Sequence, residues 1–172
     1  MFKIEEIDPA HYRAQTRKST MIAVAIFLVI GFFTARLTVT QLGEYSDNHI
    51  VLNLMGAFVG LVITLWIIKS FFADAPWMKE AVYGWNLKRR LMYIYNAMSL
   101  LEKAAEQDDV EAIKILRFYH LGQEQMLRFD NNSHELFELG LKMRPLETKM
   151  NEMGIDLNQT EFDMKSVDAY RK

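Results

Sequence analysis

The sequence predicts an all-α membrane protein in which a two-helix transmembrane hairpin is followed by a cytoplasmic antiparallel three-helix bundle. Two long apolar runs without acidic or basic residues, 21–35 and 50–68, predict the hairpin. The second run has about 19 residues, which at helical rise matches the hydrocarbon thickness of a bilayer. Beyond it the chain is much more polar and carries apolar residues at helical spacing, which predicts the bundle.

Capping and turn residues divide the chain into four parts. Asp8 followed by Pro9 begins the first helix, because a carboxylate caps a helix N-terminus and proline fits its first position. Pro76, after Asp74 and Ala75, ends the second helix and begins the next. The parts are an N-terminal helical lead at 1–18, the hairpin at 19–72 with spans at about 19–42 and 48–72, the bundle at 76–155 and a polar tail at 156–172.

Three amphipathic stripes predict the helices of the bundle. In each stripe the apolar residues are separated alternately by three and four positions, which places them on one face of a helix. Asp108 and Asp109 separate the first stripe from the second, and the turn at 131–133 separates the second from the third. Pro145 within the last stripe predicts a kink or a short break. The stripes are Leu87, Leu91, Ile94, Met98, Leu101 and Ala105; then Ala112, Ile115, Tyr119, Gly122, Met126 and Phe129; then Leu136, Leu139, Met143, Leu146, Met150 and Met153.

The distribution of Lys and Arg predicts the orientation in the membrane. Basic residues precede the first apolar run and follow the second, whereas the loop at 43–49 contains Glu44 and Asp47 but no Lys or Arg. Short loops rich in Lys and Arg remain cytoplasmic. We therefore expect a multi-pass protein with both termini in the cytoplasm. The absence of cysteine is compatible with that reducing compartment.

Small residues in the two runs predict close helix packing. Gly56 and Gly60 form a GxxxG pattern that Thr64 extends by one turn, and Gly31 and Ala35 give the first run a similar face. Small residues at this spacing allow two helix backbones to approach each other. Two arrangements remain open: the two faces pack against each other inside the hairpin, or Gly56 and Gly60 contact another copy or a partner protein.

Polar and basic residues near the membrane are further candidates. Arg36 and Asn53 lie within or near the apolar runs, where polar groups are costly and usually paired. Arg36 either extends to the lipid headgroups or contributes to a pore. Lys88, Arg89 and Arg90 lie within about 20 residues of the second run, and they either contact anionic lipid headgroups or form the wet side of a helix.

No motif in the sequence predicts catalysis, a cofactor or nucleic-acid binding. Gly-rich phosphate loops, GxSxG and HExxH patterns are absent, and the net charge of −2 includes no basic tract. His120 with Glu124 and His134 with Glu138 repeat an i, i+4 spacing on adjacent helices. Di-metal helix bundles need Glu-x-x-His and further glutamates from facing helices, a pattern that the sequence lacks. We therefore expect no enzyme, no metal and no cofactor.

Particular stretches give the chain a resemblance to a known family. They are LRFYHLGQEQ at 116–125 followed by DNN at 130–132, together with the early pair Tyr12-Arg13. With its tight apolar hairpin and helical second half, the chain resembles an uncharacterised bacterial two-span inner-membrane family, a domain of unknown function. The resemblance covers most of the chain. It implies this fold and a location in the bacterial inner (cytoplasmic) membrane, and it brings no activity, ligand or functional residue.

These features predict a non-enzymatic inner-membrane interaction protein. We expect an accessory or scaffolding subunit that docks through its membrane hairpin and its cytoplasmic helical bundle. The expected partners are membrane lipid and either further copies in a homo-oligomer or a larger membrane complex, with no nucleic acid and no small-molecule substrate. The alternative is a small homo-oligomeric channel or transporter component lined by Arg36, Asn53 and Thr64.

Overall fold

The computed structural model describes residues 1–46 and 48–171 and divides into two compact units. Ala14–Val82 form the first, which we call the hairpin unit. Met1–Arg13 together with Tyr83–Lys172 form the second, which we call the helical domain. The N-terminal lead is therefore not a separate part of the chain, because most of it belongs to the same unit as the second half.

Both boundaries between the units fall inside helices. The first lies within α1 (Pro9–Leu42) and the second within α3 (Lys79–Tyr95). Asp8 caps α1, because its carboxylate accepts a hydrogen bond from the amide of His11 at 2.7 Å. The helix start predicted at Pro9 is confirmed, and the helix continues without interruption through the first predicted span to Leu42. Its first turn is part of the helical domain, and its remaining residues belong to the hairpin unit.

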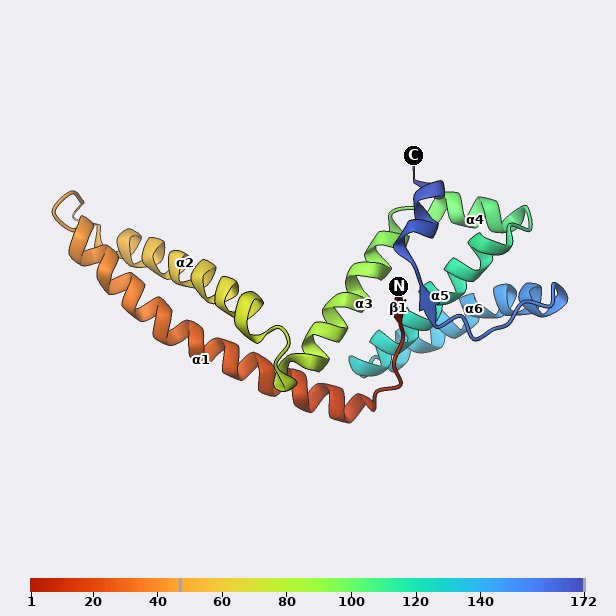
Figure 1. The fold of residues 1–172 in the computed structure, drawn as a ribbon, viewed down its shortest axis with the longest axis horizontal. Coiled ribbons are helices and arrows are strands. Elements are labelled where there is room, and N and C mark those ends of the chain that lie inside the picture. The colour runs from red at the N-terminus through yellow and green to blue at the C-terminus, as the bar shows by residue number, and fades with distance from the viewer. Residues whose placement is uncertain (47, 172) are drawn as a thin grey trace. The chain divides into compact units, whose positions relative to one another are not determined.

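The hairpin unit contains two antiparallel helices that lie side by side (Figure 1). α2 (His49–Ile67) follows a short loop; its expected start near Asp47 lies outside the described residues. α2 passes into a π-helical turn at Ile68–Phe72, and a 3-10 turn at Pro76–Met78 precedes α3. Both α1 and the segment His49–Phe72 are long and apolar enough to cross a membrane.

One face of α2 packs directly on α1. A Cβ atom on Gly56 would lie 2.5 Å from Cα of Ala35, and one on Gly60 would lie 2.6 Å from Cα of Gly31. No side chain tolerates such distances, so the two backbones are in contact. In the structure the GxxxG face therefore packs inside the hairpin, against the small face of α1. The buried residues of this face are Leu52, Gly56, Gly60 and Thr64, which lie four positions apart.

The third helix expected from the sequence is two helices in the structure. α3 ends at Tyr95, and α4 (Met98–Glu106) begins after Asn96 and Ala97. The amide of Ala97 donates to the carbonyl of Ile94 at 2.9 Å, a 3-10 contact that bends the chain, while Ala97 itself stays buried. The apolar stripe continues across the bend, so periodicity alone predicted one helix. The expected three-helix bundle is therefore wrong in its number of helices. α3 and α4 stand where one helix was expected, and two further helices follow them.

α5 (Val110–Phe129) and α6 (Ser133–Glu152) form an antiparallel pair (Figure 1). Asp109 caps α5, and Asn132 caps α6, each through a side-chain oxygen that accepts from amides of the first turn. Both turns were predicted from these residues. Pro145 lies inside α6 without ending it, so the expected break does not occur.

The segment before α1 is extended and pairs with the end of the chain. β1 (Phe2–Lys3) and β2 (Glu161–Phe162) are antiparallel, with Phe2 opposite Phe162. Phe162 is 4% exposed, and its ring stacks on that of Phe118 with 4.8 Å between centroids. Strands of two residues give no readable alternation, which explains why the sequence did not predict them.

The end of the chain also belongs to the core, although its composition predicted a polar tail. A 3-10 helix at Met164–Tyr170 buries Val167 completely. The hydroxyl of Tyr170 donates to the carboxylate of Asp109 at 2.8 Å, which fastens this helix to the start of α5. Phe162 and Tyr170 thus anchor the end of the chain to the helical domain.

Tyr12 and Arg13 join the first turn of α1 to the helical domain. The ring of Tyr12 stacks on Phe129 with 3.7 Å between centroids and 6° between planes. The hydroxyl end of the Tyr12 ring lies against Gly84, where an added Cβ atom would collide with the phenol oxygen. Arg13 donates to the carbonyl oxygens of Arg128 and Phe129 at 3.3 and 3.2 Å. These are carbonyls of the last turn of α5, where the negative end of the helix dipole favours a cation.

We predict that Gly60→Leu destabilises the hairpin unit by about 1–3 kcal/mol, because the added side chain must displace the backbone of α1. Gly140→Leu is the matched control: a Cβ atom at this α6 glycine has no neighbour within 4 Å. Thermal unfolding of the full-length protein in detergent, followed by circular dichroism, measures both. Equal melting temperatures for the two variants would contradict the close contact of α1 and α2.

Candidate functional site

A groove of about 640 Å³ opens between α3, α5 and α6 of the helical domain. Its floor is apolar, and much of that floor is accessible: Met92 is 61% and Tyr95 is 60% exposed. Grooves of this size with a mostly apolar lining are typical binding sites. The apolar and aromatic residues that line it are Leu91, Met92 and Tyr95 from α3, Tyr119, Met126 and Leu127 from α5, and Leu139 from α6.

The two walls of the groove differ in charge. Lys88 lies on the α3 wall, whereas Glu135, Glu138 and Lys142 lie on the α6 wall. α3 contains a single acidic residue, Glu80, which does not line the groove. A ligand that carries charge is therefore oriented by the groove, with its negative groups toward α3 and positive groups toward the two glutamates.

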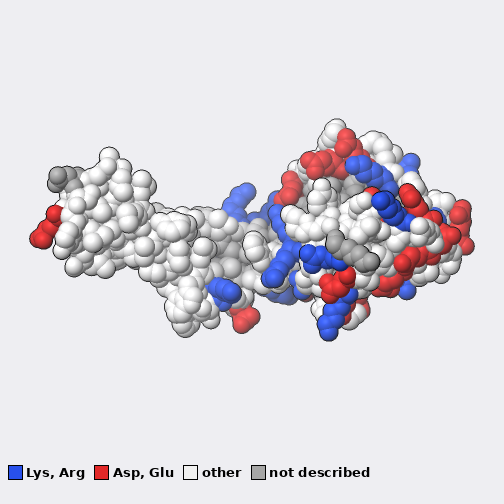
Figure 2. Space-filling model, turned by 90° about the horizontal axis from the view of Figure 1, so that it is seen from above, with Lys and Arg blue, Asp and Glu red and all other residues white. Residues whose placement is uncertain are grey.

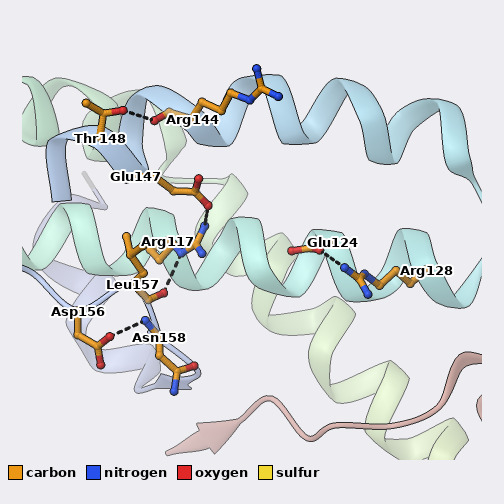
Figure 3. Close-up of polar contacts among 9 residues, drawn as sticks. All are labelled: Arg117, Glu124, Arg128, Arg144, Glu147, Thr148, Asp156, Leu157 and Asn158. Atoms are coloured by element: carbon orange, nitrogen blue, oxygen red, sulfur yellow. Dashed lines mark hydrogen bonds and ion pairs between the residues drawn. The ribbon is translucent and has the colours of Figure 1, made fainter. Parts of the chain in front are cut away.

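A buried polar cluster lies on the other side of α5 (Figure 3). Arg117 is 8% exposed; its Nε donates to the carbonyl of Leu157 at 2.9 Å, and its Nη1 donates to Glu147 Oε1 at 2.6 Å. These contacts join α5, α6 and the segment after α6. Arg117 is buried and Glu147 is half-buried, and a hydrogen-bonded ion pair in such surroundings fixes geometry more than it adds stability. The cluster positions the segment that leads to β2.

His120 lies beside this cluster and is uncharged at neutral pH. Its Nδ1 is buried and has no hydrogen-bond partner among the described residues. Burial, followed by the positive charge of Arg117, lowers the pKa of His120 to about 4, and the charge of Glu147 opposes this shift. A neutral imidazole is a potential metal ligand, but no group of three or more His, Cys, Asp or Glu able to hold a metal occurs in the described part of the chain.

The structure does not combine the two histidine–glutamate pairs into one site. Glu124, which the spacing assigned to His120, binds Arg128 at 2.6 Å. His134 lies 3.8 Å from Glu138 on an open part of α6, with its side chain 83% exposed. Each pair is a local feature of one helix.

The three basic residues that follow the second apolar run lie in two different environments. Lys88 and Arg89 are exposed on α3. Arg90 instead covers the ring of Phe2, with its guanidinium carbon 4.3 Å from the ring centroid, and donates to the carbonyl of Asn86. Burial, followed by the charge of Arg89, lowers the pKa of Arg90. Arg90 thus holds the N-terminal strand in place.

The polar residues of the hairpin unit also differ in their exposure to solvent. Arg36 and Asn53 are exposed, and the amide of the Asn53 side chain donates to the carbonyl of His49 at 2.8 Å. Thr64 is 2% exposed and donates to the carbonyl of Gly60 at 2.8 Å. Thr64 therefore lies in the contact between α1 and α2, whereas Arg36 and Asn53 lie on the exposed surface of the hairpin unit.

Comparison with known proteins identifies the family. A family model described as "Protein of unknown function (DUF3087)" matches residues 2–167. The chain belongs to this family. The resemblance to a domain of unknown function is thereby confirmed. No curated protein and no solved structure matched the chain.

In this DUF3087 chain the residues that carried the resemblance mainly hold the helical domain together. The side-chain amide of Gln125 donates to the carbonyl of Glu5 at 2.6 Å and accepts from the hydroxyl of Tyr83. That hydroxyl accepts in turn from the amide of Glu5. Gly122 leaves room for Leu91, since a Cβ atom there would lie 2.7 Å from its methyl group. The segment 116–125 therefore anchors both the N-terminal strand and α3.

Sequence reasoning missed part of the groove. Tyr95 and Leu127 line it but fall in no predicted motif, and Tyr95 is 60% exposed. On the same helix as Tyr95, Trp85 does not line the groove but is 70% exposed. One signal was present: the chain has no Asp or Glu from Ala81 to Leu101. A stretch that is acid-free and helical, with large apolar residues outside its core stripe, indicates a helix face that contacts something other than water.

We predict that His120 makes the helical domain less stable in mild acid. Its pKa falls from about 6.5 in the unfolded chain to about 4 in the folded one, so the unfolded state binds more protons between these values. Stability is complete above pH 6.5 and is lost as the pH falls toward 4. At pH 5 the loss from this group is about 2 kcal/mol.

Urea unfolding of the full-length protein in detergent at pH 7 and pH 5, followed by circular dichroism, measures this loss. His120→Gln removes the titrating group and reduces the difference between the two pH values. The control, His134→Gln, replaces an exposed histidine and leaves the difference unchanged. The same pH dependence in both variants would contradict the burial of a neutral His120.

Proposed function

We propose that this DUF3087 protein is a non-enzymatic, two-span protein of the bacterial inner membrane that acts as an accessory or scaffolding subunit. The observation that carries the proposal is the exposure of large apolar side chains on the hairpin unit. The most apolar window of α1 is 6% buried, and that of His49–Phe72 is 22% buried. The core helix of a water-soluble protein would instead be mostly buried.

The size of this exposed apolar surface supports a lipid environment. Each large aliphatic or aromatic side chain gains about 1.5–3 kcal/mol when it leaves water. Figure 2 shows few charged atoms on the hairpin unit. A bilayer covers such a surface without further protein. The side chains more than 60% exposed include Leu28, Phe32, Phe33, Leu54, Phe58 and Trp66.

Two contacts support retention of α1 as a membrane anchor in the mature protein. Tyr12 and Arg13, at the start of α1, are bound to the helical domain. Gly31 and Ala35, further along the same helix, pack on α2. A cleaved signal sequence would remove one partner of each contact. The Lys and Arg that flank the hairpin, with none in its described loop, favour cytoplasmic termini.

The groove supports the role of a subunit that docks on another protein. α3, α5 and α6 surround a space open on one side, as in a four-helix bundle that lacks one helix. The occupant that fits is an amphipathic helix of a partner protein. Its apolar stripe would contact Tyr95, and its basic edge would face Glu135 and Glu138.

The orientation has a direct test. The chain contains no cysteine, so a single Tyr45→Cys variant carries one thiol in the loop between α1 and α2, where Tyr45 is 85% exposed. A membrane-impermeant thiol reagent added to intact cells should label it. Thr148→Cys, exposed on α6, should be labelled only after lysis. The reverse pattern would contradict the orientation, and equal labelling of both before lysis would contradict the membrane hairpin.

The docking role is tested by the native mass of the protein extracted in mild detergent. We expect a hetero-complex, and we expect Tyr95→Asp to weaken it about 30-fold, because an exposed aromatic anchor in a groove is a typical hot spot. Phe137→Asp is the matched control: Phe137 is 69% exposed on α6 and does not line the groove. A closed homo-oligomer in place of a hetero-complex would favour the channel alternative. An unchanged hetero-complex with Tyr95→Asp would contradict docking in the groove.

A further inference from the structure

We propose that the outer face of α3 binds the anionic headgroup surface of the bilayer, through Trp85, Arg89 and Met92 with Lys88 at its edge. This inference rests on the proposed membrane hairpin and adds a second lipid-binding site, in the helical domain. Trp85, Arg89 and Met92 are spaced i, i+4, i+7 and therefore share one face of the helix. Trp85 is 70% and Met92 is 61% exposed, and both basic side chains are exposed.

The opposite face of α3 is fixed, so this face has a defined direction within the domain. Leu87 and Ile94 are completely buried, and Leu91 is 8% exposed. Gly84 on that side contacts Tyr12. α3 cannot rotate about its axis to bury Trp85 or Met92 without exposing this core. The outer face is a permanent part of the domain surface.

The chemistry of the face matches an anionic lipid interface. Tryptophan prefers the headgroup region, because its ring is large and apolar while its N–H is polar. Lys and Arg near an anionic surface each strengthen binding about five-fold. No acidic residue between Ala81 and Leu101 opposes that attraction. Arg90 is excluded from the site, because its guanidinium lies over Phe2.

The length of the chain permits the contact. Trp85 follows Phe72, the end of the second membrane-length segment, by about 13 residues, which span about 20 Å where the chain is helical. A face that close in sequence to a membrane helix, with two cations and a tryptophan, is typical of juxtamembrane segments that bind acidic lipid. The groove side of the same helix, which carries Tyr95, stays available to a protein partner.

The test uses the full-length Met92→Cys variant, whose thiol is unique in the chain. The thiol carries an environment-sensitive dye, and the protein is placed in nanodiscs of phosphatidylcholine alone or enriched in phosphatidylglycerol, with a headgroup-level quencher lipid in each. We expect stronger quenching and a blue-shifted emission in the phosphatidylglycerol discs, with the difference reduced by high salt. A dye at Thr148→Cys should respond equally in both discs.

Charge-matched variants identify the residues responsible. Adding Lys88→Gln and Arg89→Gln should weaken the phosphatidylglycerol-dependent quenching about 10-fold to 30-fold, from the five-fold contribution of each cation. Lys142→Gln with Arg144→Gln removes the same charge from exposed positions on α6 and should leave the quenching unchanged.

Each other result overturns the inference in a distinguishable way. Failure of the protein to enter nanodiscs would overturn the membrane hairpin and this site together. Incorporation with no quenching difference between the lipids would overturn the anionic-lipid site alone. Strong quenching in both lipids that does not change in the Lys88 and Arg89 variants would show that the face makes a purely apolar contact with the membrane. Shielding of the dye only when a hetero-complex is present would assign the face to a protein partner.

Discussion

The stacking of Tyr12 on Phe129 is the contact on which the rest of the structure depends. It places the first turn of α1 against α5, and Arg13 strengthens it by binding the carbonyls at the end of α5. Gly84 is the complementary requirement on α3, because any larger residue would occupy the position of the Tyr12 hydroxyl. α1 and α3, the two helices that continue into the hairpin unit, are thus fixed at one place in the helical domain.

Close backbone contact plays the same part in the hairpin unit. Gly56 and Gly60 allow α2 to lie against Gly31 and Ala35, so that the hairpin is one packed pair and not two independent helices. The side chains left outside are almost all apolar, with Arg36 and Asn53 as exceptions. The small residues lie in the contact between α1 and α2, and the large apolar residues face outward. This distribution is the reverse of that in a water-soluble helical pair, and it is the physical basis of the proposed membrane location.

The sequence predicted the elements that rest on local signals. Asp8 with Pro9, Asp109 and Asn132 each marked a helix start that the structure contains. The apolar stripes contained many core residues of α3, α4 and α5, but Ile113, Leu116 and Phe118 of the core lie outside them. The bend at Ala97 was not predictable from periodicity, because the stripe continues through it. The pairing of Phe2 with Phe162 was not predictable either, because it involves two residues on each side and depends on the whole intervening chain. For the candidate site, Lys88 and Arg89 were identified from their charge, whereas the groove is formed by three helices whose relative positions no single segment encodes.

The pairing of β1 with β2 has a consequence for the order in which the protein is made. Phe2 leaves the ribosome long before its partner Phe162. A hairpin that inserts while the chain grows would be in the bilayer before this pair can form. In the meantime the N-terminal segment can be held by the contacts of Phe2 with Arg90 and of Glu5 with Gln125. Contacts of such long sequence separation form slowly, so the strand pairing would be a late step in the folding of the helical domain.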